Sequence, residues 1–340
     1  MYICYMRNFT KPPEYVKLLA KAAKYYQIEV IYSHPKNVDV DNEVINGFTL
    51  HDNKWREIEI PVPPYIDLNS YCYKYKDVAA FLKKESTLLN LKGFGSKMKL
   101  YNTLIEDGTF AKYVPDMVQI TDFNSFMQFI QKHQRAILKP KVGHKGIGVY
   151  LVHQIDEDSY QLYVNNSEKM LAAEELKAYI EELIDDKVYL AQQYIQSLTT
   201  EGSPFDCRIR LEKNGEGKWA VAIPLIRIGS NNKVVSNVAQ GGGVQKLLPF
   251  IIIKFHYPED WKDIKAECDY VAEYLPPKLE ALYRKQTSCL GIDIGIDTDG
   301  KIYIFEVNAA PGVEFGEAEI INLKADYYHY LKQQESNIML

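Results

Sequence analysis

Two acids and one amide near the end of the chain could together hold a divalent cation. Asp293, Glu306 and Asn308 lie in the stretch GIDIGIDTDGKIYIFEVNAAPG, in which Asp299-Gly300 is typical of a hairpin turn. In that hairpin Glu306 and Asn308 share one face of a strand, and Asp293 lies on the strand before it. Three hard oxygen donors on one face suit Mg²⁺ carrying nucleotide phosphates. The alternative is a solvated hairpin, but a carboxylate inside the apolar run IYIFEV needs a partner, which favours a metal.

A glycine-rich loop after an apolar strand is a candidate phosphate contact. Lys139 ends the strand AILK and is followed by KVGHKGIG, whose glycines let backbone N–H groups approach phosphate oxygens. The spacing matches neither a P-loop nor a dinucleotide-binding fingerprint. The loop runs from strand to strand, so we expect a flap between antiparallel neighbours, although an ordinary hairpin loop has the same composition. The loop residues expected to meet phosphate are Gly143, Lys145, Gly146 and Gly148.

Two further segments are compatible with nucleotide binding. Lys97 stands at the start of an expected helix, where a cation opposes the helix dipole unless an anion is nearby. A surface lysine is the alternative. The strand YLAQQYI runs into a loop, and its edge could offer adenine a backbone donor and acceptor beside an apolar slot. Any buried strand would look the same.

The order of predicted elements indicates three segments. A strand, a helix opening at Pro12-Pro13 and a second strand form a βαβ-like start, which indicates a small α/β domain at residues 1–95. The second segment, 96–196, holds the glycine-rich loop, and the third, 197–340, holds the acidic hairpin. Expected strands include 2–6, 28–32, 135–140, 149–153, 160–164, 188–195, 205–212, 219–228, 233–235 and 250–255, with a hairpin at 47–62. Expected helices are 75–91, 96–106, 123–133, 173–183, a stretch at 259–285 kinked or interrupted by Pro276-Pro277, and a tail.

Composition excludes several classes of protein. The chain has 340 residues, 46% of them hydrophobic, and a formal net charge of −5, so no basic surplus indicates a nucleic-acid binder. Five scattered cysteines give neither a disulfide framework nor a zinc site, which fits a reducing, cytoplasmic setting. We expect neither a signal peptide nor a membrane span, because no window approaches ~20 apolar residues.

Taken together and in this order, five segments resemble an ATP-grasp enzyme: GSKMKLYNTL, AILKPKVGHKGIGVY, YLAQQYI, FDCRIRL and DIGIDTDGKIYIFEVNAAPG. More closely, the chain resembles the YheC/YheD family, which is linked with the endospore coat. This resemblance also includes GFTLHDNKWREIEIPVP, FDCRIRLEKNGEGKWAV and IRIGSNNKVVSNVAQGGG. The resemblance implies an α+β protein in which two lobes clamp ATP, preceded by a small α/β domain.

The resemblance also implies roles. Lys97 and Lys139 would contact ATP phosphates, the 143–148 loop would close over them, and Arg208 and Arg227 would meet phosphate or a substrate carboxylate. Adenine would be held by Gln192, Gln193, Tyr194 and Ile195, with Gln192 standing where many ATP-grasp enzymes have Glu. Asp293, Glu306 and Asn308 would hold Mg²⁺, as two ions, with Mn²⁺ as a substitute.

The implied activity is a ligase that joins a carboxylate to an amine or thiol through an acylphosphate. The alternatives are a spore-coat structural protein with an ATP-grasp shell and a small-molecule kinase. The partners would be ATP, the two substrates, whose identity the sequence does not give, and spore-coat proteins. The site of action would be the cytoplasm or the surface of the forespore or spore coat.

Overall fold

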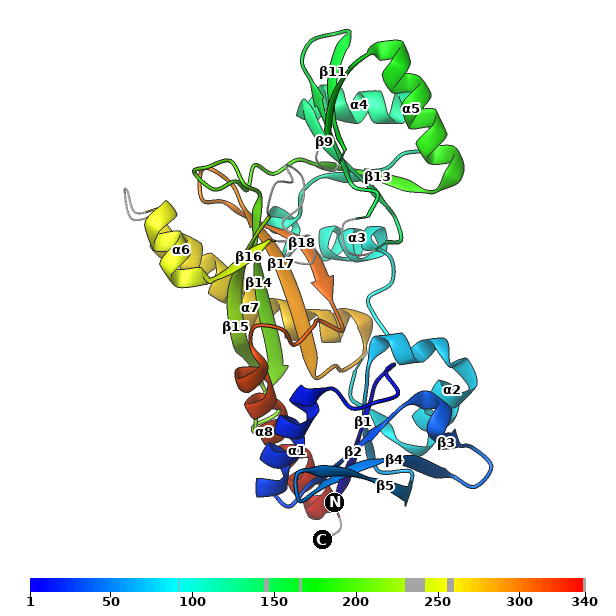
Figure 1. The fold of residues 1–340 in the computed structure, drawn as a ribbon. Coiled ribbons are helices and arrows are strands. Elements are labelled where there is room, and N and C mark those ends of the chain that lie inside the picture. Colours follow the sequence, from blue (N-terminus) through cyan, green and yellow to red (C-terminus); the bar gives the residue numbers. More distant parts are fainter. Residues whose placement is uncertain (91, 144–146, 165–166, 230–241, 256–259, 339–340) are drawn as a thin grey trace.

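The structure is a computed structural model that describes the whole chain except residues 91, 144–146, 165–166, 230–241, 256–259 and 339–340. Three bodies follow one another along its length: an N-terminal domain, a large central lobe and a small lobe at the far end (Figure 1). Among the described residues, no helix combines the length and apolar character needed to cross a bilayer.

The N-terminal domain is built on a mixed sheet with the strand order β3-β4-β2-β1-β6-β7 and with β5 beside β4. Its elements are β1 (Tyr2–Met6), α1 (Glu14–Tyr25), β2 (Glu29–Ser33), η1 (Pro35–Asn37), β3 (Val38–Asp39), β4 (Val44–His51), β5 (Lys54–Pro61), β6 (Tyr65–Leu68), η2 (Ser70–Lys74), α2 (Lys76–Glu85) and β7 (Thr87–Leu88). β1 pairs in parallel with β2 and β6, which confirms the βαβ start. The hairpin turn at Asp52 and Asn53 is also confirmed, since both residues have positive φ. The helix expected to reach residue 91 ends at Glu85, because β7 pairs with β6 instead.

The small lobe is a six-stranded sheet with the order β12-β11-β10-β9-β13-β8. It comprises β8 (Met117–Gln119), α4 (Phe123–His133), β9 (Arg135–Pro140), β10 (Tyr150–Gln154), β11 (Ser159–Val164), β12 (Ser167–Ala172), α5 (Ala173–Asp186) and β13 (Tyr189–Gln193). α4 and α5 share an apolar core with the sheet. β9 and β10 are antiparallel, so the glycine-rich loop joins antiparallel neighbours as expected. The polar edge strand β12 was not predicted.

The large lobe contains the antiparallel sheet β16-β15-β14-β17-β18. Its elements are α3 (Lys97–Asp107), η3 (Ala111–Tyr113), β14 (Phe205–Lys213), β15 (Trp219–Ile228), β16 (Gly243–Lys246), α6 (Leu247–Lys254), α7 (Trp261–Tyr283), β17 (Cys289–Ile296) and β18 (Ile302–Asn308). Residues on one face of the sheet, such as Cys207, Ile209 and Ile292, pack into one core with α3, α6 and α7. Because side chains alternate along a strand, the even-numbered residues of β14 face the other way.

The strand expected at 250–255 is wrong: the segment lies mostly in α6, whose Leu247, Phe250 and Ile251 are buried at helical spacing. Pro276 and Pro277 do not interrupt α7. The strand expected at 233–235 lies outside the described residues.

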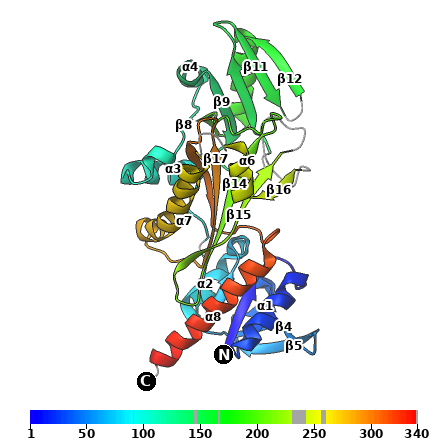
Figure 2. The ribbon, with the colours of Figure 1, turned by 90° about the vertical axis from the view of Figure 1, so that its left-hand side faces the viewer.

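The last helix, α8 (Glu317–Ile338), leaves the large lobe and lies along α1 of the N-terminal domain (Figure 2). Ile321, Tyr327, Tyr328 and Leu331 belong to the same core as the buried face of α1. Part of the 197–340 segment therefore helps to build the N-terminal core.

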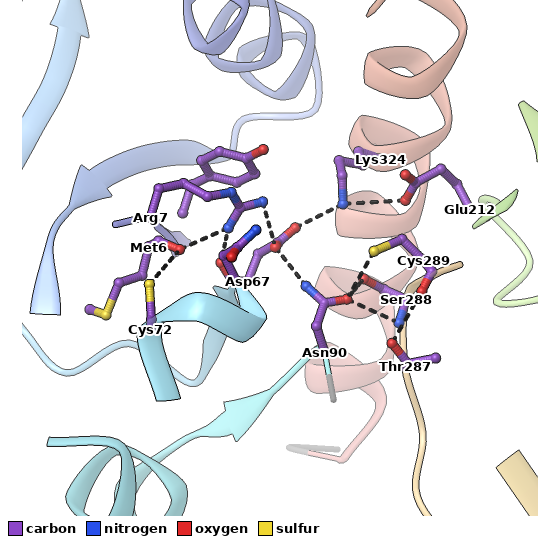
Figure 3. Close-up of polar contacts among 12 residues, drawn as sticks. Met6, Arg7, Asp67, Cys72, Asn90, Glu212, Thr287, Ser288, Cys289 and Lys324 are labelled. Carbon is purple, nitrogen blue, oxygen red and sulfur yellow. Dashed lines mark hydrogen bonds and ion pairs between the residues drawn. The ribbon is translucent and has the colours of Figure 1, made fainter. Parts of the chain in front are cut away.

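A buried polar network fastens the N-terminal domain to the large lobe (Figure 3). The Asp67 carboxylate at the end of β6 accepts from Arg7 Nη2 at 2.9 Å, Asn90 Nδ2 at 2.7 Å and Lys324 Nζ of α8 at 3.0 Å. Lys324 also lies 3.2 Å from Glu212 of β14. Burial raises the pKa of Asp67, but its ion pairs with Lys324 and Arg7 outweigh burial and hold that pKa well below its usual value. The ionised Asp67 carboxylate thus connects the residue after β1, the segment after β7 and helix α8.

Candidate active site

The β17–β18 hairpin places the two acids directly opposite each other. Asp293 pairs with Glu306 in the ladder, and the register shifts immediately after Asp293, so that Phe305 is the extra residue of a bulge. The expected turn at Asp299-Gly300 is confirmed, with Gly300 at φ 79°. The hairpin thus presents both carboxylates on the sheet face that the large lobe's apolar core does not cover.

The third candidate metal ligand lies beside these acids. Asn308 Nδ2 is 3.4 Å from Asp293 Oδ2 and 3.5 Å from Glu306 Oε2. A half-turn of the amide would offer its oxygen instead of its nitrogen. The structure therefore brings the three residues together, two strands contributing to one cluster.

Arginine side chains already hold the Asp293 carboxylate. Arg208 donates side-on, from Nε to Oδ1 and from Nη2 to Oδ2, both at 2.6 Å. Arg227 Nη2 lies 3.2 Å from the same Oδ2 and also pairs side-on with Asp206. Burial raises the pKa of Asp293, but Arg208 and Arg227 outweigh it, so the pKa is lowered. Asp293 is ionised and saturated with donors.

The donor set fits a divalent cation only in part. The Glu306 side chain is partly exposed, and its ion-pair partner, Lys97 Nζ, is 3.6 Å away. Because this ion pair is long, the Glu306 carboxylate can turn toward an ion together with Asn308. Asp293 can do so only if an arginine leaves. Within the described ranges, no three His, Cys, Asp or Glu side chains are grouped as a metal site, so the amide of Asn308 would be needed as a donor.

A cleft opens beside this cluster between the two lobes. It holds about 390 Å³ of empty space, the part open to solvent included. Its charged and polar lining comes from four elements: Lys97 of α3, Lys139 of β9, Gln192 of β13 and Glu306 of β18. Its apolar lining includes Leu100, Leu104, Val114, Met117, Ile304 and Phe305. A planar apolar group bearing anions fits this combination of linings.

Lys139 is the half-buried cation of the cleft. Its ammonium group donates to Gln192 Oε1, a neutral acceptor where a glutamate would have supplied a charge. Burial, helped by the nearby Lys97 and opposed by Glu306, lowers the pKa of Lys139 to about 8. An incoming anion would add negative charge beside this lysine, whose hydrogen-bond acceptor is neutral.

The two ends of the glycine-rich loop are described. Lys97 Nζ donates to the Gly143 carbonyl at 3.1 Å, which ties α3 to the start of the loop. Gly148 has φ 72°, and a Cβ there would come within 3.1 Å of Pro140 and the Tyr189 hydroxyl, so the position requires glycine. Lys145 and Gly146 lie outside the described residues.

The four residues expected to contact adenine do not all lie at the cleft. Gln192 lines the cleft, whereas Gln193, Tyr194 and Ile195 are not among the described residues that line it. The Gln193 N–H donates to the Asp116 carbonyl at 2.8 Å and the Tyr194 N–H to the Arg135 carbonyl at 3.3 Å. Ile195 offers its carbonyl to the Ser197 N–H. These backbone groups serve the sheet and the turn after it.

Sequence reasoning missed the apolar half of the cleft and one carboxylate. Leu104, Met117 and Phe305 gave no chemical signal on their own. Gly295 was a usable signal, because any Cβ there would overlap the Phe305 ring at 2.0 Å, so this glycine allows the ring its place. Asp206 is the missed carboxylate: the structure pairs it with Arg227.

Comparisons with known proteins agree with this architecture. The chain is 24% identical over 314 residues to the endospore coat-associated protein YheC of Bacillus subtilis (strain 168), covering 88% of this chain and 85% of that protein. Its fold is similar to a Chryseobacterium gregarium RiPP-associated ATP-grasp ligase in complex with ADP and a leader and core peptide (TM-score 0.57, 13% identity, 96% of each chain). It is also similar to D-alanyl-alanine synthetase A of Vibrio cholerae (TM-score 0.57, 12% identity, 97% of this chain and 98% of that one).

At these low identities the solved structures establish the fold alone, which is α+β and ATP-grasp. The family assignment comes from the sequence: the family described as YheC/D like ATP-grasp matches residues 85–332, most of the chain. This protein therefore belongs to the YheC/D-like ATP-grasp family.

Proposed function

We propose that the protein is an ATP- and Mg²⁺-dependent ligase that joins a carboxylate to an amine or a thiol through an acylphosphate. One observation carries the proposal: Lys97, Lys139 and Glu306, from three elements of two lobes, line one cleft together with apolar side chains. A spore-coat scaffold would not require this convergence of charged groups.

The residues of the cleft divide the work of binding ATP. Lys97 and Lys139 neutralise phosphate oxygens, and Met117 and Phe305 offer apolar surface to adenine. We expect the glycine-rich loop to close over the phosphates, and Gln192, which among the described residues of 192–195 is the one that lines the cleft, to border the base. Phosphoryl transfer needs little acid–base chemistry from the protein, so positioning and charge neutralisation are the main contributions.

Glu306 and Asn308 would hold Mg²⁺, joined by Asp293 when its arginine partners move. When bound, the ion supplies charge neutralisation on the phosphate oxygens. Arg208 and Arg227 lie on the same sheet face and present planar guanidinium groups, which suit bidentate contacts to a phosphate or carboxylate. Asp206 fixes the orientation of Arg227.

The relatives suggest where to look for substrates. ATP-grasp proteins bind ATP and Mg²⁺, and the similar structures include a peptide-bound ligase and a dipeptide synthetase by name. Amino acids, peptides and cell-wall precursors are therefore the first compounds to test. The name of YheC supports a role at the spore coat, with coat proteins as partners.

The test is product analysis with Mg·ATP and pairs of carboxylates and amines or thiols, selected by thermal shift. A ligase releases ADP and phosphate only when the acceptor is present. A phosphorylated hydroxyl compound would identify a kinase instead. Absence of both turnover and nucleotide binding would leave the structural role.

A further inference from the structure

Seven charged side chains surround the junction of the cleft and the hairpin. They are the cations Lys97, Lys139, Arg208 and Arg227 and the anions Asp206, Asp293 and Glu306. Four cations against three anions leave one positive charge. A free divalent cation would enter an already positive site, whereas a cation bound to a triphosphate would arrive with net negative charge.

Asp293 is closed to a cation while its two arginines stay in place. Arg208 contacts both of its oxygens, and Arg227 adds a contact to Oδ2. An ion within coordination distance of either oxygen would lie a few ångström from two guanidinium groups. Such an ion would have to displace an arginine as well as bind.

The two arginines are not equally free to leave. Arg227 has a second carboxylate, Asp206, which holds it side-on. The hydrogen bonds and ion pairs of Arg208 to other described residues all go to Asp293. The Arg208 side chain is also more exposed than that of Arg227, 27% against 17%. Arg208 is thus the arginine that can exchange partners.

We propose that Arg208 is an exchangeable counter-ion of Asp293, which keeps free divalent cations off this carboxylate and releases it when a nucleotide phosphate takes up the guanidinium. The inference rests on the proposed nucleotide site. It adds that metal binding through Asp293 depends on nucleotide binding, with Arg208 as the positioning residue that links the two.

The test is the affinity for Mn²⁺, measured as free Mn²⁺ by electron paramagnetic resonance, in the full-length protein without nucleotide and with a non-hydrolysable ATP analogue. The wild type should bind Mn²⁺ weakly alone and more tightly with the analogue. Arg208→Met should tighten Mn²⁺ binding without nucleotide by about tenfold or more, since it removes a unit charge a few ångström from a divalent ion. It should also weaken binding of the analogue.

Two further variants keep the test decisive. The double variant Arg208→Met/Asp293→Asn should lose the gain, because the gained ligand is Asp293. If Arg208→Met does not fold, Arg208→Lys, which keeps the charge but not the side-on contact, should give a smaller gain in the same direction. Arg56→Met, on an exposed position of β5, is the matched control and should change nothing.

If the folded Arg208 variant binds Mn²⁺ without nucleotide no more tightly than the wild type, the proposal that Arg208 is an exchangeable counter-ion is wrong. It is also wrong if the double variant keeps the increase in Mn²⁺ affinity. A wild type that binds no analogue at all would refute the proposed function instead. The Mn²⁺ measurement without nucleotide would still decide whether Arg208 keeps free divalent cations from binding to Asp293.

Discussion

Asp293 and Glu306 face each other across the β17–β18 ladder, yet their carboxylates have different partners. Asp293 is buried and held by Arg208 and Arg227, whereas Glu306 is partly exposed with Lys97 at 3.6 Å. Glu306 is therefore accessible as a metal ligand, whereas the arginines block access to Asp293. Glu306 is the carboxylate of the pair that a cation can reach without displacing an arginine.

Replacing Glu306 with Gln should reduce Mg²⁺-dependent ATP turnover by about a hundredfold or more while the protein stays folded. The amide keeps the shape of the side chain but removes the charge that attracts the ion. Turnover is measured as ADP release with a competent substrate pair, and folding by circular dichroism. Asp299→Asn, in the exposed turn of the same hairpin, should leave turnover unchanged. Wild-type turnover in the Gln variant would exclude Glu306 as a metal ligand.

Replacing Lys139 with Met should weaken ATP binding by about tenfold to a hundredfold, the usual value of a hydrogen bond to a charged group. The variant keeps the apolar stem and loses the ammonium that faces the cleft. Calorimetric titration with Mg·ATP measures the change, and Lys169→Met on the exposed edge strand β12 serves as control. Equal affinities of wild type and Lys139→Met would remove this lysine from the phosphate site.

ATP affinity should fall as pH rises through about 8, the pKa of Lys139. The protonated lysine is the form that binds phosphate, and bound phosphate raises its pKa, so binding above this pH must be accompanied by proton uptake. Titrations in buffers with different ionisation enthalpies detect that uptake. Lys139→Met should bind weakly but with little pH dependence in this range. A wild-type affinity that stays constant from about pH 7.5 to 9.5 would contradict the assignment.

Asp67→Asn should lower the free energy of unfolding by about 3–5 kcal/mol, because it leaves the buried cations Arg7 and Lys324 without their shared carboxylate. Denaturant unfolding measures the effect. The exposed Asp41→Asn is the control and should change stability by less than about 0.5 kcal/mol. A small effect at Asp67 would show that the junction between α8 and the N-terminal domain does not depend on this network.

Local patterns predicted the pieces of the candidate site well. The Asp299-Gly300 turn, the period of two in Glu306 and Asn308, and the loop between antiparallel strands are all short-range features, and the structure has each of them. A serine directly before a helix is also a short-range feature: the Ser96 hydroxyl accepts from the Lys99 N–H at 3.2 Å at the start of α3.

Partners distant in the sequence could not be predicted in the same way. Arg208 meets Asp293 because β14 lies beside β17, and Asp67 meets Lys324 because α8 returns to the N-terminal domain. Strand order and the course of the last helix decide these pairs, and no local pattern encodes either. The apolar segment of α6 was predicted as a strand, because a short apolar run fits a buried strand and a half-buried helix equally well.

The central claim, that Lys97 and Lys139 converge on a nucleotide bound between the lobes, is tested most directly by calorimetric titration with a magnesium-loaded, non-hydrolysable ATP analogue. The account predicts one analogue bound per wild-type chain and no measurable binding to a folded Lys97→Met/Lys139→Met variant. Binding to that variant with wild-type affinity would contradict it.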